Sequence, residues 1–221
     1  MKPMIVLGLG VVLALAAAEP GTQPAGTAGL VPLPAPSSES TMGLEDAIRL
    51  RRSCRHFSEQ PLRPKEIGQL CWAGQGITDR EHGFRASPSA GALYPVELFV
   101  VTAEGVDRYV PEKHAMQRHL AGDVRKELQR AALGQSQVGQ APASIVVAAD
   151  VSRTARKYRD RAERYCWMEA GHVAQNVLLQ ATALNLGGVP VGAFEDDKAA
   201  AAIRLPKGWQ VLYLLPIGHP G

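Results

Sequence analysis

The sequence predicts one α+β domain with helices layered on a sheet, and three observations lead to this class. Apolar strand patterns, strongest at 96–102 and 143–150, are separated by long helical patterns. The glycines at 187, 188 and 192 follow a helix rather than a strand, which is the reverse of a dinucleotide-binding fingerprint. The 221 residues, 46% of them hydrophobic and 20% charged, are enough for one ordinary core.

The first 18 residues have the pattern of a signal peptide. Lys2 precedes an apolar run from Met4 to Leu15, and three alanines ending at Ala18 fit a cleavage site. We therefore expect export, to the periplasm; the alternative is an uncleaved N-terminus that tethers the protein to a membrane. The apolar run is too short for a comfortable membrane span, so no integral membrane domain is expected.

Residues 19–43 are expected to be a linker, and residues 44–221 the folded domain. The linker segment carries Pro20, Pro24 and three further prolines among scattered Gly, Ser and Thr, with almost no apolar periodicity. Such a segment cannot bury enough surface to offset the entropy lost on ordering.

Charge and cysteine content argue against a nucleic-acid partner, a zinc site and a full disulfide framework. The net charge of +3 is small and the basic residues are spread along the chain, so no nucleic-acid partner is expected. Cys54, Cys71 and Cys166 show no CxxC spacing, which argues against a zinc site. Their odd number argues against a complete disulfide framework, but one disulfide among them stays open.

The elements follow in chain order. A helix is expected at 44–53, and a second at 62–76, because Pro64 marks its start and Gly74 and Gly76 its end. Further elements are a strand at 96–102, a short strand at 107–111, an amphipathic helix at 123–133, a buried strand at 143–150, a long helical segment at 152–186, a helix at 196–205 and a last strand at 210–218. The long segment should bend once, and its second half, which is almost entirely apolar, should pack on more than one face.

The first stretch that indicates chemistry is RRSCRHF, where a basic cluster follows the first helix. Its candidate residues are Arg51, Arg52, Ser53 and Arg55. The rigid fork of arginine suits phosphate and planar carbonyl groups, and serine adds a short donor. The alternative is that these cations only complement the C-terminal dipole of the helix.

Two further stretches consist of small, turn-forming residues. PSAGALYP leads into the strand at 96–102, and NLGGVPVGAF at 185–194 follows the long helix. Small residues let a flat ligand approach the backbone, because no Cβ bulk stands in the way. Together with the arginines, the two loops would enclose a planar ligand with a phosphate tail; an ordinary strand-entry loop is the alternative for PSAGALYP.

These stretches resemble a known family. LRRSCRHF, PSAGALYPVELFVV, GHVAQNVLLQATALNLGGVPVGAF and LYLLPIGHP occur in the order seen in the FMN-dependent nitroreductase superfamily, and the resemblance covers residues 44–220. The SAGALYP form is similar to the SagB/ThcOx-type dehydrogenases, the branch that oxidises azolines.

The resemblance implies a nitroreductase-like layered α+β fold, with an antiparallel or mixed central sheet flanked by helices. It also implies an intertwined homodimer with FMN in each of two interface clefts. By position, the FMN phosphate, ribityl chain and pyrimidine edge would contact Arg51, Arg52, Ser53 and Arg55. The residues that would line the flavin are Pro88, Ser89, Ala90 and Gly91. Val191 and Gly192 would place a backbone N–H near flavin N5.

Some positions depart from the family pattern. General nitroreductases carry Asn and Gln where this sequence has Ala92 and Tyr94, so Tyr94 either edges the substrate pocket, as the candidate catalytic residue, or only packs. His172 on the long helix is a core or dimer-interface histidine, with a proton donor as the alternative. Many relatives continue past the last strand with basic residues that bind phosphate; here that role would pass to the N-terminal arginines and His219.

The expected activity is that of an FMN-dependent oxidoreductase, a SagB-type dehydrogenase that passes hydride through flavin N5 in a two-step cycle. Its substrate would be a small molecule or a peptide azoline. No sequence feature identifies a nicotinamide pocket, and export would make NAD(P)H scarce. The alternatives are an NAD(P)H-dependent nitro or quinone reductase, and a flavin-binding protein without independent turnover.

Overall fold

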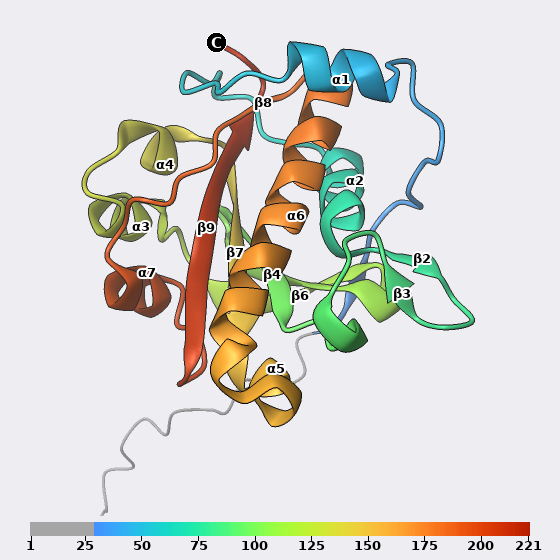
Figure 1. The fold of residues 1–221 in the computed structure, drawn as a ribbon. Coiled ribbons are helices and arrows are strands. Elements are labelled where there is room, and N and C mark those ends of the chain that lie inside the picture. Colours follow the sequence, from blue (N-terminus) through green and yellow to red (C-terminus); the bar gives the residue numbers. More distant parts are fainter. Residues whose placement is uncertain (1–28) are drawn as a thin grey trace, which may run out of the picture.

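A seven-stranded antiparallel sheet forms the centre of the structure, a computed structural model that describes residues 29–221 (Figure 1). Its strands lie in the order β1-β6-β5-β4-β7-β9-β8. They are β1 (Val31–Pro32), β4 (Val96–Thr102), β5 (Gly105–Val110), β6 (Ala115–Ala121), β7 (Ala143–Asp150), β8 (Gly187–Gly188) and β9 (Trp209–Gly218). A separate hairpin pairs β2 (Ile77–Asp79) with β3 (Phe84–Arg85).

Helices cover both faces of this sheet. The seven α-helices of the described residues are α1 (Leu44–Leu50), α2 (Pro64–Gln75), α3 (Arg125–Ala131), α4 (Ser136–Gln140), α5 (Val151–Tyr158), α6 (Ala162–Ala183) and α7 (Asp196–Ala202). Helices α2 and α6 pack on one face, and α3, α4 and α7 pack on the other (Figure 1). The long helix α6 therefore lies across the middle of the molecule.

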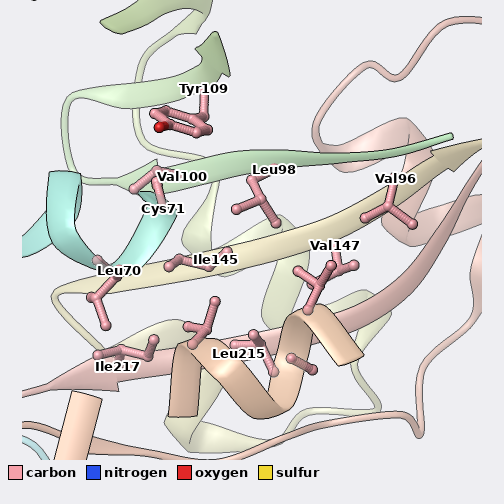
Figure 2. Packing of buried hydrophobic residues seen from close by; sticks show 14 of the residues in the cluster. Leu70, Cys71, Val96, Leu98, Val100, Tyr109, Ile145, Val147, Leu215 and Ile217 are labelled. Carbon is pink, nitrogen blue, oxygen red and sulfur yellow. The ribbon is translucent and has the colours of Figure 1, made fainter. Parts of the chain in front are cut away.

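The two faces explain why the central strands are apolar throughout. In β4, Leu98 and Val100 face the core beneath α2 and α6, whereas Phe99 and Val101 face the opposite core. Ile145 and Val147 of β7 lie in the first of these cores (Figure 2). A strand buried on both faces has no polar side, so its sequence reads as a continuous apolar run.

The fold class is confirmed, and most elements lie where the sequence predicts them. The long helical segment breaks once, at Arg159, whose φ is +47°. The first helix ends at Leu50, so Arg51 to Arg55 form a loop and not a helical turn. Six elements were not expected: strands β1, β2, β3, β6 and β8, and helix α4, which are short or have mixed polarity.

Part of the expected linker belongs to the folded domain. Val31 and Pro32 pair with β6 at the edge of the sheet, and the backbone N–H of Ser37 donates to Gln69 Oε1 over 2.8 Å. The assignment of 19–43 as linker is thus wrong for residues 31–37, because an open sheet edge offers backbone partners to a proline-rich segment. The signal-peptide prediction and the rest of the linker up to residue 28 lie outside the described residues.

Three further observations concern the cysteines, metal binding and membrane spans of residues 29–221. Cys54, Cys71 and Cys166 are all free thiols, and burial raises the pKa of Cys71. No group of His, Cys, Asp and Glu side chains in this range is arranged to hold a metal ion. None of the helices in this range has the length and apolar character needed to cross a bilayer.

Candidate functional site

The arginine loop lies against the glycines that follow α6. Ser53 forms a parallel bridge with Gly188, and the backbone N–H of Cys54 donates to the carbonyl of Gly188 over 3.0 Å. A Cβ on Gly187 would lie 2.6 Å from Cys54 Sγ, so only glycine permits this close approach. Two stretches that are far apart in sequence are thus brought together as expected.

The arginines of this loop differ in what they contact. Arg52 Nη1 donates to the carbonyls of Arg49 and Arg51, over 3.0 and 2.7 Å, so it caps α1 as the dipole alternative predicted. Within residues 29–221, the side chains of Arg51 and Arg55 have neither a carboxylate nor a hydrogen-bond partner. These two cations remain available to an anionic ligand.

Gly192 offers a free backbone donor four residues after Gly188, the partner of this loop. Val191 is buried, and its N–H donates to the carbonyl of Leu214 over 2.8 Å, so it is already used. The N–H of Gly192 has no backbone partner among the described residues, and a Cβ added there would meet nothing within 4 Å. Of the two residues expected near flavin N5, Gly192 therefore has both the free donor and the open space.

The second predicted loop is a tight turn with unusual backbone angles. Gly91, Ala92 and Tyr94 all have positive φ, at +64°, +53° and +47°. The backbone N–H of Tyr94 donates to Ser89 Oγ over 2.9 Å, which closes the turn. Left-handed angles at two non-glycine residues store strain, and such strain persists only where surrounding contacts hold it.

Helix α6 supports this turn from beneath. Asn176 Nδ2 donates to Ser87 Oγ over 3.2 Å. Glu169, only 2% exposed, accepts from the backbone N–H of Val96 over 3.4 Å and from the Ser89 hydroxyl. Burial raises the pKa of Glu169, against the hydrogen bonds that lower it. The turn therefore rests on a buried carboxyl group that sequence reasoning missed, because a lone glutamate in a helix carries no distinguishing pattern.

Tyr94 is held by Arg85. The Tyr94 hydroxyl accepts from the backbone N–H of Arg85 over 3.1 Å, and the Arg85 guanidinium lies 4.7 Å from the centre of the Tyr94 ring. The side chain is half-buried. These contacts match the packing alternative for Tyr94, and they orient the strained turn.

Lys157 and Tyr158, at the end of α5, were also missed. A Cβ on Gly91 would lie 2.8 Å from the Tyr158 hydroxyl and 2.9 Å from Lys157 Nζ. One phenol and one ammonium group therefore lie at the exposed Gly91. Their only sequence signal is a run of basic residues on a helix, which usually indicates a solvated face.

Two histidines occupy different surroundings from those expected. His172 is exposed on α6, which excludes the core alternative and leaves the interface and proton-donor alternatives. His219 Nε2 lies 3.8 Å from Glu66 Oε2, so it faces α2 instead of the arginine loop.

The two halves of the predicted site lie on different sides of α6. The arginine loop adjoins Gly188, whose Cβ would lie 3.0 Å from Leu178, and the turn contacts Asn176 through Ser87. Asn176 and Leu178 are two residues apart, so they point to nearly opposite sides of the helix. Gly91 lies further along the turn, against α5.

Apolar side chains are exposed along the same side of the molecule. Trp167 and Met168 of α6 are 58% and 47% exposed, and Leu44 and Ile48 of α1 are also exposed. Exposed aromatic and aliphatic groups of this size on neighbouring helices are typical of an interface.

Comparison with known proteins now identifies the family. The Nitroreductase family profile matches residues 48–219. This chain belongs to the nitroreductase family. A nitroreductase-family protein of Methanocaldococcus jannaschii, MJ1384, is 44% identical over 182 residues, which cover 80% of this chain and 90% of that protein. A nitroreductase-family crystal structure from Ralstonia eutropha has a TM-score of 0.80 at 29% identity, covering 89% of this chain and 92% of that one.

Two more distant structures share the fold of this nitroreductase-family chain. The NADPH:FMN oxidoreductase of Vibrio harveyi, complexed with NAD+, has a TM-score of 0.61 at 24% identity, covering 80% of this chain and 68% of that one. A chain of the Escherichia coli microcin synthetase McbBCD complex has a TM-score of 0.69 at 22% identity, covering 94% and 85%.

Proposed function

We propose that this nitroreductase-family oxidoreductase binds FMN at the arginine loop and acts as a SagB-type dehydrogenase. The observation that carries the proposal is the pair Arg51 and Arg55, which have no carboxylate partner among residues 29–221 and flank Ser53, the residue that bridges to Gly188. Free guanidinium groups next to a small-residue loop fit a ligand that has both a phosphate and a flat ring.

The residues present fit FMN in three respects. Arg51 and Arg55 would bind the phosphate and the pyrimidine edge, Ser53 is exposed and would donate to the phosphate, and the N–H of Gly192 would point at the ring. Gly187 and Gly188 let the arginine loop pack close to β8, because a Cβ at either position would meet the side chain of Cys54 or Leu178. When bound, FMN supplies the two-electron chemistry, because it accepts hydride at N5 from one substrate and reduces a second.

We also propose that the complete site needs two copies of the chain. Within one chain the strained turn contacts α6 at Asn176, whereas the arginine loop adjoins Gly188 beside Leu178. These two helix positions point to nearly opposite sides of α6, so the two loops do not face one common pocket. A second copy packed on the apolar faces of α1 and α6 would bring its turn to the first copy's arginines. The exposed Trp167 and Met168 support this homodimer.

In this arrangement the turn and α5 would contribute proton chemistry. Pro88, Ser89 and Ala90 would line the ring, with Glu169 holding Ser89 from beneath. Lys157 and Tyr158, which lie against Gly91, would exchange a proton with the substrate as its C–H bond is broken. Azoline oxidation removes a hydride and a proton together, so it requires such a group.

The choice of substrate is supported by the turn itself. SAGALYP resembles the azoline-oxidising branch, and this chain shares its fold with part of a microcin synthetase. The alternative, an NAD(P)H-dependent nitro or quinone reductase, is favoured by the family name and by the shared fold of an NADPH:FMN oxidoreductase. Export, which the first 18 residues predict, would limit access to NAD(P)H.

The absorbance spectrum of the purified protein tests FMN binding. We expect flavin bands, and release by acid of a compound with the mass of FMN, at about one per chain. A folded, colourless protein that takes up no added FMN would contradict the proposal.

Rapid-mixing kinetics then separates the activities. If the azoline activity is correct, a peptide azoline bleaches the bound flavin faster than NADPH does. Faster bleaching by NADPH would support the reductase instead, and a yellow protein that no donor reduces would support a flavin-binding protein without independent turnover.

A further inference from the structure

A second group of arginines, separate from the arginine loop, surrounds a small cavity. Arg85 of β3, Arg108 of β5 and Arg153 of α5 line a space of about 170 Å³, together with Glu97 and Glu112. This volume holds roughly five water molecules. Three guanidinium groups from separate elements thus converge on a space large enough for a small ion.

The carboxylates around this cavity leave the arginines incompletely satisfied. Glu97, 8% exposed, contacts Arg153 Nη2 over 2.7 Å and Arg108 Nε over 2.5 Å. Glu112, over half exposed, pairs with Arg85 at the rim, where water screens the pair. Asp150 lies 3.7 Å from Arg153 Nε, beyond hydrogen-bond distance, and its other oxygen accepts from Ser152.

Arg108 is the least satisfied of the three. Its Nε and the facing Glu97 Oε2 are close, but the N–H is not aimed at the oxygen, and both atoms are buried without a hydrogen bond. Its terminal nitrogens have no partner among residues 29–221. Because 42% of the Arg108 side chain is exposed, an ion can reach the cavity from solvent.

The cavity is directly coupled to the turn that carries Gly91. Arg153 Nη1 donates to the Tyr94 carbonyl over 2.8 Å, and Arg85 stacks on the Tyr94 ring. Arg85, 11% exposed, also donates to Gln75 Oε1 over 3.1 Å. An ion bound to these arginines would therefore change the contacts that hold the strained turn.

We propose that Arg85, Arg108 and Arg153 form a binding site for a small oxyanion, a phosphate or carboxylate group. Guanidinium N–H groups match both geometries, and the site is distinct from the predicted flavin phosphate site at the other end of α6. This inference does not depend on the flavin proposal, because none of its residues belongs to the arginine loop.

Isothermal titration of the purified protein tests the site, and the Arg51→Ala/Arg55→Ala double variant, titrated in parallel, shows whether the arginine loop contributes to the heat. Inorganic phosphate and sodium acetate are titrated in separate arms at constant ionic strength set with chloride. We expect one saturable site in at least one arm, and the stronger arm identifies a phosphate or a carboxylate group. Arg108→Gln should weaken this binding about tenfold or more.

Arg118→Gln is the matched control. Arg118 is 40% exposed on the neighbouring strand β6 and pairs with Asp107 over 2.8 Å, away from the cavity, so binding should stay within about twofold. Absence of saturable heat with both ions, or an equal loss in the two variants, would overturn the proposal.

If Arg108→Gln does not fold, chemical labelling of the protein without any substitution tests the same proposal. The bound ion should slow the reaction of phenylglyoxal with Arg108 and leave Arg118 unaffected, as read by peptide mass mapping. Equal rates at Arg108 with and without the ion would overturn the proposal as well.

Discussion

Glu169 is a buried carboxyl group beneath the strained turn, and its protonation is linked to folding. Burial raises its pKa, and the hydrogen bonds from Ser89, Val96 and Gln75 only partly oppose this. A raised pKa means that the folded chain binds the proton more tightly than the unfolded chain does. The stabilisation is therefore complete below the ordinary carboxyl pKa of about 4.3 and is lost as the pH rises through the folded-state pKa.

Replacing Glu169 with Gln should remove this pH dependence. The free energy of unfolding of the natural protein should fall above about pH 4.3, by at most about 1.4 kcal/mol per pH unit for one proton. In Glu169→Gln that part of the slope should be missing, as measured by urea denaturation across the pH range. Glu163→Gln, exposed on the same helix, is the control and should keep the slope; identical slopes in all three proteins would exclude the linkage.

Arg51 and Arg55 are the residues on which cofactor affinity should depend. Arg51→Ala together with Arg55→Ala should weaken FMN binding at least about 100-fold, because hydrogen bonds to charged groups contribute about 1.5–3 kcal/mol each. Fluorescence titration of FMN measures the change. The fold and the proposed dimer should remain, since neither side chain has a hydrogen-bond or ion-pair partner among the described residues.

Arg49→Ala provides the comparison for this double variant. Arg49 precedes the loop and already pairs with Asp46 over 2.8 Å, so its removal should leave FMN affinity unchanged. Unchanged flavin affinity in the double variant would count against the phosphate and pyrimidine contacts assigned to the loop.

At the scale of elements, helix α6 has one face that packs in the core and another that would form the proposed dimer interface. Its inner face packs against β4, β7 and β9, and its outer face leaves Trp167 and Met168 exposed. The sequence predicts a helix packed on more than one face, because its second half is almost entirely apolar. That second half, which begins at Glu169, packs against both the sheet and α2 within one chain. Trp167 and Met168 precede it and would be covered by a second chain.

Trp167→Glu should therefore dissociate the proposed dimer. Each of the two chains would lose about 1.5–3 kcal/mol of apolar burial, so the dimer dissociation constant should rise about 100-fold or more. Light scattering with chromatography measures the mass, and flavin content should fall with it.

Leu133→Glu is the control for this variant. Leu133 is 62% exposed just after α3, on the opposite face of the sheet, so the dimer should persist. A natural protein that is monomeric at micromolar concentration, or flavin retained by a monomeric Trp167→Glu, would contradict the two-chain site.

At the scale of the whole molecule, the sheet keeps the two predicted loops apart. Residues 88–91 lead into β4 at the end that faces α5, and residues 51–55 pair with β8 at the other end. Antiparallel pairing of β4, β7 and β9 sets this arrangement. In the proposed function, a single chain carries two half-sites, and a second copy of the chain would complete each site.

The sequence by itself determined the fold class, the main strands and the position of the long helix. Apolar runs and helical periodicity are local signals, and they reported β4, β7, β9 and α6 correctly. Strands β1, β2, β3, β6 and β8 lacked such a signal, because they are short or of mixed polarity and several of them pair with neighbours far along the chain.

Only the tertiary structure decided which polar groups meet. It divided the basic loop into Arg52, which caps α1, and the uncommitted Arg51 and Arg55. It also placed Glu169 under the turn and gathered Arg85, Arg108 and Arg153 around one cavity. Periodicity records whether a residue faces the core, whereas the partner of a charged side chain depends on how distant elements pack, and no local pattern contains that information.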